Sequence, residues 1–328
     1  MSRPAAWRAN WTEGEGSKFA GRPAPESDAE YSTLTYEVDG RIARITFNRP
    51  QRGNAITADT PGDIASAVER ADLDPRVHVI LLSGRGKGFC GGYDLFETAE
   101  QNFAGAEGDG TVLDPAVQAA NHDPFASGPG GAWDPMIDYA MMSRFNRGFS
   151  SLLHADKPTV AKVHGFCVAG GTDIALYCDQ IICADDAKIG YPPTRVWGVP
   201  AAGMWAHRLG DQRAKRLLLT GECLTGTQAA QWGLAVESCR ADELDQRADL
   251  LVGKIAAMPV NQLMMVKLAL NSALLAQGVQ NSTMISTVFD GISRHTREGY
   301  AFQLRAAEVG FREAVRERDQ PFGDHKRP

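Results

Sequence analysis

Two short glycine-rich segments combine residues that could stabilise and protonate a reacting carbonyl group. Residues 164–180 read HGFCVAGGTDIALYCDQ, where Gly170 and Gly171 precede Asp173. Residues 83–95 read SGRGKGFCGGYDL, where a second glycine pair precedes Tyr93 and another acid. Two convergent backbone N–H groups stabilise negative charge that develops on an ester or thioester oxygen. The two segments therefore favour an oxyanion site beside a carboxylate.

Asp173 is open to two interpretations. The apolar residues that follow it, Ile174, Ala175 and Cys178, predict a buried helix that starts at the glycine pair. A first-turn acid is stabilised by the helix macrodipole, so Asp173 could be purely structural. A carboxylate within hydrogen-bond reach of a substrate can also move a proton. We favour the catalytic interpretation.

Residues 86–91, GKGFCG, also match the GxGxxG pattern of dinucleotide-binding proteins. Such sites need a helix at the third glycine and an acid about 20 residues later, after a second strand. A stretch rich in glycine and proline occupies that region here, and no Gly-Lys-Ser/Thr sequence of a Walker A loop is present. A nicotinamide-linked oxidoreductase is therefore the less favoured hypothesis.

Short strands and helices must position these segments. Alternating residues around Asp39 and Gly40 predict a hairpin over 34–47, and apolar spacing over 64–71 predicts a helix. The β-branched run at 77–83 predicts a buried strand. Further strands are predicted within 159–163, 179–184 and 187–191, and helices within 136–155, 172–178, 212–220, 226–233, 242–257, 261–276 and 280–317. Short strands with crossover helices indicate an α/β core followed by a helical part.

The composition divides the chain into three parts. Residues 1–32 are rich in glycine, proline and charge and are typical of an extended or disordered arm. Residues 33–258 form the predicted α/β core, and 259–328 the C-terminal helical region. The core contains a segment at about 98–135 with many glycines and prolines and little periodicity. We interpret it as an insertion and expect it near the mouth of the pocket.

Charge and hydropathy restrict the partners and the compartment. The 328 residues carry a net charge of −6 and a pI of about 5.7, which argues against a general nucleic-acid binder. No apolar run is long enough for a membrane span, and the N-terminus lacks the apolar segment of a signal peptide. The six cysteines form no CxxC motif, so we expect reduced thiols, no metal site and a cytoplasmic location.

Five segments together resemble the crotonase superfamily, also called the enoyl-CoA hydratase/isomerase family. They are ITFNRPQRGNAIT (45–57), VILLSGRGKGFCGGYDL (79–95), KPTVAKVHGFCVAGGTDIALYCDQIICADDAKIGY (157–191), GVPAAG (198–203) and RLLLTGECLTGTQAAQWGLAVE (216–237). They occur in family order. The resemblance implies a spiral of ββα turns and C-terminal helices that assemble homotrimers or dimers of trimers. It also implies a coenzyme A thioester as substrate, with no permanently bound cofactor.

The resemblance assigns roles to individual residues. It places the two oxyanion N–H groups on Tyr93 and Gly170. It places coenzyme A contacts on two loops, at Arg52, Asn54 and Ala55, and at Lys87, Phe89, Cys90 and Gly91. Trp197 is expected to wall the acyl pocket.

The chain departs from the family at its acids. Hydratases of the family use two glutamates, and these positions correspond to Asp173, which is one methylene shorter, and Pro193. A further acid used by some members corresponds to Ala201. The nearest groups that could substitute are Tyr191, Thr194 and Arg195. Arg195 could hold a substrate carboxylate or carbonyl, or could equally form a surface ion pair.

These observations lead to a primary hypothesis and two alternatives. The primary one is an acyl-CoA enzyme of the enoyl-CoA hydratase/isomerase type, with hydratase as the default activity. An isomerase or C–C hydrolase that uses a single acid is the first alternative, because Pro193 removes the second. The other is an acyl-CoA-binding protein with little or no turnover.

Overall fold

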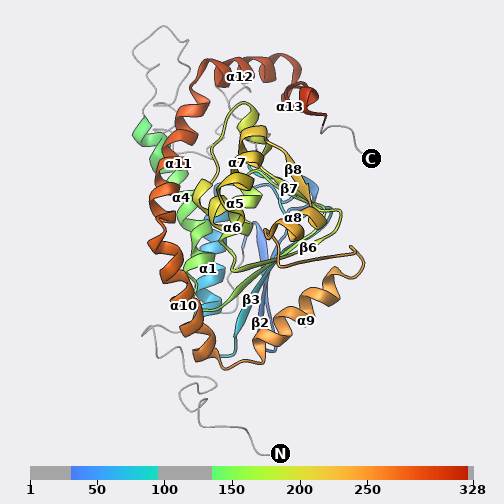
Figure 1. The fold of residues 1–328 in the computed structure, drawn as a ribbon, viewed down its shortest axis with the longest axis vertical. Helices are drawn as coiled ribbons and strands as arrows, with labels where there is room; N and C mark the ends of the chain where they lie inside the picture. Colours follow the sequence, from blue (N-terminus) through green and yellow to red (C-terminus); the bar gives the residue numbers. More distant parts are fainter. Residues whose placement is uncertain (1–30, 95–134, 324–328) are drawn as a thin grey trace, which may run out of the picture.

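The structure, a computed structural model, describes residues 31–94 and 135–323, where two β-sheets lie among helices (Figure 1). The larger sheet has the order β1-β2-β3-β4-β6-β9, in which β1 and β2 are antiparallel and the other neighbours parallel. Its strands are β1 (Leu34–Asp39), β2 (Ile42–Phe47), β3 (Val79–Gly84), β4 (Thr159–Val163), β6 (Gln180–Ala184) and β9 (Glu237–Cys239). The smaller sheet has the order β5-β7-β8, with β5 (Phe166–Val168), β7 (Lys188–Gly190) and β8 (Cys223–Thr225).

Local sequence signals account for the start of the larger sheet. The predicted hairpin is confirmed, and Gly40 in its turn has a φ of 59°, which glycine adopts without steric cost. In β2 the alternate residues Ala43, Ile45 and Phe47 are buried. The consecutive apolar residues of β3 are buried on both faces, as the continuous run predicted.

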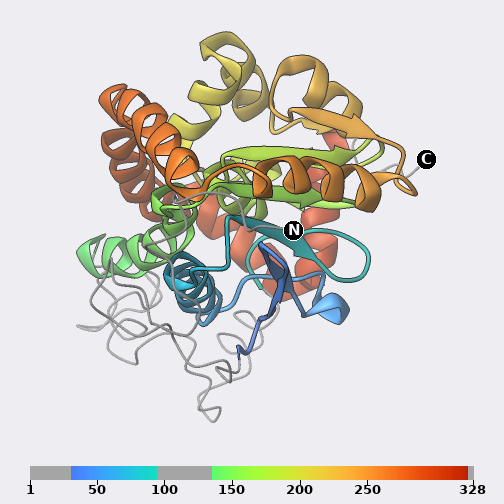
Figure 2. The same cartoon turned by 90° about the horizontal axis from the view of Figure 1, so that it is seen from below.

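Helices cover the larger sheet. Helix α9 (Leu244–Ala256) contacts β2, β3, β4, β6 and β9. The helices α1 (Thr60–Leu73) and α4 (Pro135–His154) pack against each other, and α4 also contacts α5 (Gly170–Tyr177) (Figure 2). The predicted helices at 64–71, 136–155 and 172–178 are therefore confirmed.

Shorter elements follow the second glycine segment. They are the 3-10 helix η4 (Pro192–Arg195) and the helices α6 (Ala202–Leu209), α7 (Asp211–Thr220) and α8 (Gly226–Trp232). The 3-10 helix η2 (Pro50–Arg52) lies earlier, between β2 and α1. Helix α6 was not predicted, and neither were the three-residue strands β8 and β9.

The prediction of one helix over 280–317 is wrong. That region contains α11 (Val279–Arg294), α12 (Arg297–Val309) and α13 (Phe311–Asp319), preceded by α10 (Val260–Ala276) and followed by η5 (Gln320–Phe322). Thr296 starts α12 as an N-cap, because its side chain accepts a hydrogen bond from the N–H of Gly299. Gly310, with a φ of 85°, separates α12 from α13. Helix α11 packs against α4 and α6, and α12 crosses the top of the molecule in Figure 1.

Two predicted segments lie outside the described residues. These are most of the arm at 1–32 and nearly all of the insertion at about 98–135, so their roles stay predictions, as do the three domain boundaries. Within residues 31–94 and 135–323, no helix has both the length and the apolar character of a membrane span.

Candidate active site

The two glycine turns lie side by side because the chain after β3 runs along β5. The N–H groups of Phe89 and Cys90 donate to the carbonyl of Phe166 at 2.9 and 3.1 Å, and the N–H of Val168 donates to the carbonyl of Cys90 at 3.1 Å. These bonds extend the smaller sheet by one short segment. The turns at 92–93 and 169–170 follow directly, one after each paired segment.

Gly92 lies close against the second turn. It has a φ of 93°, and a Cβ built on it would lie 2.7 Å from the Cβ of Ala169 and 3.5 Å from the N of Gly170. Ala169 itself has a φ of 52°, a conformation that non-glycine residues rarely adopt and that often accompanies functional sites. Among the described residues, the N–H groups of Tyr93 and Gly170 have no hydrogen-bond acceptor. Both are therefore available to a ligand.

Asn54 joins the two loops in which coenzyme A contacts were predicted. Its Oδ1 accepts a hydrogen bond from the N–H of Arg49, and its Nδ2 donates to the carbonyls of Arg85 and Gly88 at 2.8 and 2.9 Å. The side chain of Asn54 is therefore occupied in holding the loops at 49–55 and 85–88 together. If Asn54 contacts the substrate as predicted, it does so through its backbone and not through its side chain.

Arg52 belongs to a small charged cluster at the same loops. Asp94, which is buried, accepts hydrogen bonds from Arg52 at 2.9 Å and from Arg49 at 3.0 Å. Lys87 lies exposed on the neighbouring loop. The other predicted contacts on these loops differ: Phe89 and Cys90 are fully buried in the core, and the carbonyl of Ala55 binds Arg49.

A cavity of about 560 Å³ opens beside the turns. Three predicted site residues, Gly91, Tyr93 and Trp197, line it, and so does Pro193. Most of the remaining wall is apolar and includes Met141, Met142, Phe145, Phe166, Val168, Phe311 and Val315. A volume of this size is typical of ligand-binding pockets.

Arg195 does not line this cavity. Its guanidinium is buried, donates to the carbonyl of Thr220 at 3.1 Å and to Asp319 at 3.1 Å, and stacks on the ring of Phe322. Of the two interpretations of Arg195, the ion pair agrees with these contacts. The pair is buried, however, and not on the surface as expected.

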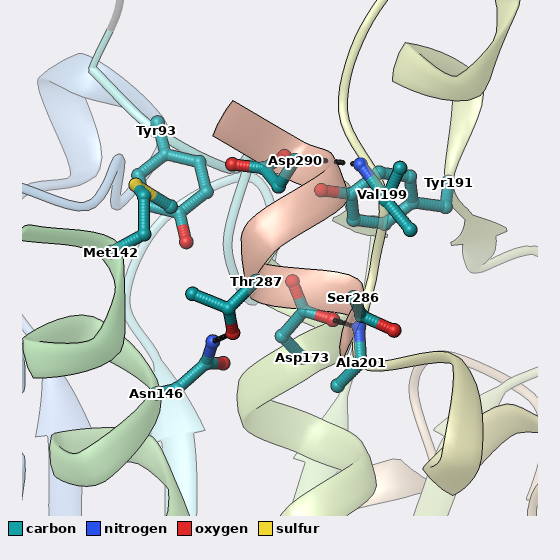
Figure 3. A pocket seen from close by; sticks show the side chains of 10 residues that line it. All are labelled: Tyr93, Met142, Asn146, Asp173, Tyr191, Val199, Ala201, Ser286, Thr287 and Asp290. Carbon is teal, nitrogen blue, oxygen red and sulfur yellow. Dashed lines mark hydrogen bonds between the residues drawn. The ribbon is translucent and has the colours of Figure 1, made fainter. Parts of the chain in front are cut away.

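A second, much smaller cavity of about 10 Å³ adjoins the first. Tyr93, Met142, Tyr191 and Asp290 line both cavities, whereas Asp173 lines the small one. Figure 3 shows the side chains of Tyr93, Asp173, Tyr191 and Asp290 directed toward this common space. A volume of about 10 Å³ is close to that needed for one water molecule.

Asp173 has the perturbed acidity of a functional carboxyl group. Burial raises its pKa to about 8, against a hydrogen bond from the N–H of Ala201 at 3.0 Å, and the charge of Asp290 adds to the rise. Burial also raises the pKa of Tyr93 and of Tyr191 well above the ordinary value, with contributions from Asp173 and Asp290. At neutral pH the site therefore holds a protonated Asp173 and two phenolic donors.

The sequence did not identify Asp290, which lines both cavities and shares the small one with Asp173. It lies on α11, where its Oδ1 accepts a hydrogen bond from the N–H of Val199 at 3.0 Å and its Oδ2 pairs with Arg294. Arg294 also pairs with Asp138 on α4. The signal in the sequence was an acid and an arginine four residues apart on a helix, a pattern most often found on exposed surfaces.

A family model described as enoyl-CoA hydratase/isomerase matches residues 37–119 and 134–305. The chain belongs to the enoyl-CoA hydratase/isomerase family. A solved enoyl-CoA hydratase from Mycobacterium smegmatis is 65% identical, with a TM-score of 0.82 over 92% of this chain and 98% of that one. An enoyl-CoA hydratase/isomerase from Xanthobacter autotrophicus Py2 is 28% identical, with a TM-score of 0.72 over 89% and 99% of the two chains. A probable enoyl-CoA hydratase from Rhizobium meliloti is 30% identical over 76% of this chain and 86% of its own length.

These likenesses confirm the predicted family and its crotonase-like α/β fold. This family member is an enzyme of the hydratase/isomerase type. The roles of its individual residues rest on the geometry above. Asp173 and Asp290 line the small cavity, and Asp94, Asp138 and Asp319 join Asp290 around the large one. Pro193 and Ala201, which the resemblance matched to acids, line the large and the small cavity without a titratable side chain.

Proposed function

We propose that the protein adds water to the double bond of an enoyl-CoA thioester, with an oxyanion hole formed by the N–H groups of Tyr93 and Gly170. The observation that supports this most is the pair of unpartnered N–H groups on two adjoining turns beside an apolar cavity of about 560 Å³. The thioester oxygen accepts both hydrogen bonds as the enolate develops. Each such donor typically lowers the activation barrier by about 2.7–4 kcal/mol.

Asp173 supplies the proton in this scheme. Because burial raises its pKa to about 8, the carboxyl group carries a proton at neutral pH and can act as a general acid. Asp173 is in the first turn of α5, three residues after the oxyanion glycine. The proton donor and one N–H donor are thus fixed by the same helical turn.

The coenzyme A portion binds along the two loops joined by Asn54. Arg49 and Arg52 form the charged cluster with Asp94, and Lys87 is exposed nearby. Cations of this kind suit the phosphates of coenzyme A. The acyl portion occupies the apolar cavity, where Trp197 packs on Phe302 with ring centroids 5.0 Å apart.

The spiral of ββα turns and assembly into homotrimers or dimers of trimers are part of this proposal. Support comes from exposed apolar side chains on the C-terminal helices, which are Met265, Val266, Leu268 and Leu270 on α10 and Met284, Ile285, Phe289 and Ile292 on α11. A patch of this kind usually marks an interface. A cytoplasmic location is likewise proposed, and the six free cysteines are consistent with it.

Two alternatives keep a specific observation in their favour. Pro193 lines the large cavity and has no proton to give, which favours an isomerase or C–C hydrolase that works with a single acid. The same feature favours an acyl-CoA-binding protein with little turnover. The pair Asp173 and Asp290 argues against both, because it restores two carboxyl groups to the site.

A turnover screen of the purified protein tests the proposal. A panel of acyl-CoA and enoyl-CoA thioesters is incubated with it and read by mass spectrometry, where hydration adds the mass of one water. Asp173→Asn should abolish hydration. The matched control is Asp63→Asn, because Asp63 is the first-turn acid of α1 and lines neither cavity. Tight thioester binding without turnover of any panel member would contradict the proposal, and thermal stabilisation by NAD(H) would favour the oxidoreductase.

A further inference from the structure

Two carboxyl groups of the site are held by one short segment of backbone, residues 199–201. The N–H of Val199 donates to Oδ1 of Asp290, and the N–H of Ala201 donates to Oδ1 of Asp173, each at 3.0 Å. Pro200 between them has no N–H, so the segment offers one donor to each aspartate. Two residues of chain span at most about 7 Å, which limits the separation of the two donors.

The segment binds one oxygen of each carboxyl group; the second oxygen of Asp290 pairs with Arg294, whereas the second oxygen of Asp173 faces the small cavity. Figure 3 shows the second oxygen of Asp173 directed into the small cavity, toward Asp290 and the ring of Tyr191. The cavity of about 10 Å³ that both aspartates line has room for about one water molecule. Asp290 also lines the acyl cavity. It therefore borders both the space for water and the space for substrate.

The surroundings of the two carboxyl groups differ in charge. Asp290 pairs with Arg294, whose guanidinium is fixed from the other side by Asp138 on α4. Burial by itself would lower the pKa of Arg294, but the charges of Asp290 and Asp138 raise it. Within the part of the chain that the structure describes, Asp173 has no cation paired with it and receives the single N–H of Ala201. A carboxylate held beside a guanidinium suits a general base, and a buried carboxyl group without such a partner suits a general acid.

We propose that Asp290 on helix α11 is the second catalytic carboxylate and acts as the general base that activates water. It would take the role of the second family glutamate, whose position the resemblance matched to Pro193. This inference rests on the proposed hydration. It assigns the acid function to Asp173 and a positioning function to Arg294 and Asp138.

The proposed step balances in atoms and charge. The water oxygen forms a bond to Cβ of the enoyl thioester while one of its protons passes to Asp290. The electron pair of the double bond moves toward the thioester oxygen, and the resulting enolate takes the proton of Asp173 at Cα. The product is the 3-hydroxyacyl thioester, with Asp290 protonated and Asp173 ionised. The proton returns from Asp290 to Asp173 through the small cavity that both line.

Asp290→Asn provides the direct test, because asparagine keeps the size of the side chain and can still accept the N–H of Val199. We expect kcat for hydration to fall by about 10²–10⁴-fold, the usual contribution of a general base. The dissociation constant of a saturated acyl-CoA should stay within about twofold. The control is Asp74→Asn, since Asp74 is similarly buried and paired with an arginine, Arg76, but lines neither cavity.

The pH profile separates a catalytic role from a structural one. The titratable groups that face Asp173 are Cys90 and Tyr93, Cys167, Tyr177, Tyr191 and Asp290, and Arg294 lies behind Asp290. The charge of Asp290 contributes to the raised pKa of Asp173. Removing that charge should therefore move the alkaline limb of the residual kcat to lower pH, whereas Asp74→Asn should leave the limb in place.

The outcomes of the test are distinct. Absence of hydration by the wild-type protein contradicts the proposed function and with it this inference. Hydration by the wild type together with near-normal kcat and an unmoved limb in Asp290→Asn overturns the inference alone. If Asp290→Asn does not fold, Asp290→Glu decides, because it keeps the charge and the ion pair but displaces the carboxylate. A loss of kcat above tenfold in folded Asp290→Glu supports the base, and wild-type kcat refutes it.

Discussion

Replacing Asp173 by asparagine should make the folded protein more stable at neutral pH while it removes activity. Asp173 is 5% exposed, and burial raises its pKa from 3.8 to about 8. Below pH 3.8 the group is protonated in both states and costs nothing. Between pH 3.8 and 8 the unfolded chain ionises while the folded one keeps its proton, so the free energy of unfolding falls as pH rises. Above pH 8 the cost is constant.

The size of the effect follows from the two pKa values. Each pKa unit corresponds to 1.36 kcal/mol, so the wild-type penalty is about 4 kcal/mol at pH 7 and about 2 kcal/mol at pH 5. Asparagine does not titrate, and its Oδ1 can still accept the N–H of Ala201. The variant should therefore gain stability over the wild type by about 1.4 kcal/mol for each pH unit in this window.

Urea unfolding of the wild type and Asp173→Asn at pH 5, 6 and 7 measures this gap directly. Both proteins are compared at one protein concentration, because self-association contributes to apparent stability. Asp63→Asn serves again as control, since Asp63 lies at a part-buried helix start and accepts a hydrogen bond from the N–H of Thr33. A stability gap between the wild type and Asp173→Asn that does not change with pH would refute the argument, whatever its size.

Three further predictions concern the loops and the C-terminal helices. Gly92→Ala places a Cβ 2.7 Å from that of Ala169 at a positive φ, so unfolding should become easier by about 1–3 kcal/mol and kcat should fall about 100-fold or more in steady-state assays. Asn54→Ala removes three hydrogen bonds to backbone groups, of which the carbonyl of Gly88 is buried; chemical denaturation should show a loss of about 3 kcal/mol, and KM for the thioester should rise. Leu270→Asp charges a side chain that is 67% exposed on α10, so size-exclusion chromatography should show smaller assemblies, and unchanged elution would count against an interface there.

Local signals in the sequence predicted much of the fold. The hairpin at Asp39 and Gly40 and the helix over 64–71 depend on neighbouring residues alone, which explains why both are confirmed. Helix α6 lacks such a signal, because it is short and contains Gly203. A Cβ on that glycine would lie 2.9 Å from the Cβ of Ser282, so contact with α11 accounts for the residue. The breaks after α11 and α12 depend on single residues, Thr296 and Gly310, within an otherwise continuous helical pattern.

The site was only half visible in the sequence. The turns around Tyr93 and Gly170 carry glycine pairs, so both could be located by pattern. Asp290 could not, because its importance comes from the packing of α11 against α4 and α6. Arg195 shows the converse case, since it is close in sequence to the expected acid position but turns away to Asp319. Neither the place of Asp290 in the site nor the absence of Arg195 from the cavity could be predicted without the tertiary contacts.

The position of Asp290 on α11 has a consequence for how the active site is completed during synthesis. Every strand of both sheets, and both glycine turns, precede α10 in the chain, and domains begin to fold as they leave the ribosome. The two glycine turns and their N–H donors can thus be formed while α11 is still untranslated, whereas the wall of the large cavity is completed only by residues of α11, α12 and α13. Asp290 joins Asp173 last, when the C-terminal helices pack against the core. A chain cut short after α9 would retain the oxyanion turns yet lack its base, so catalytic activity reports that synthesis has reached α11.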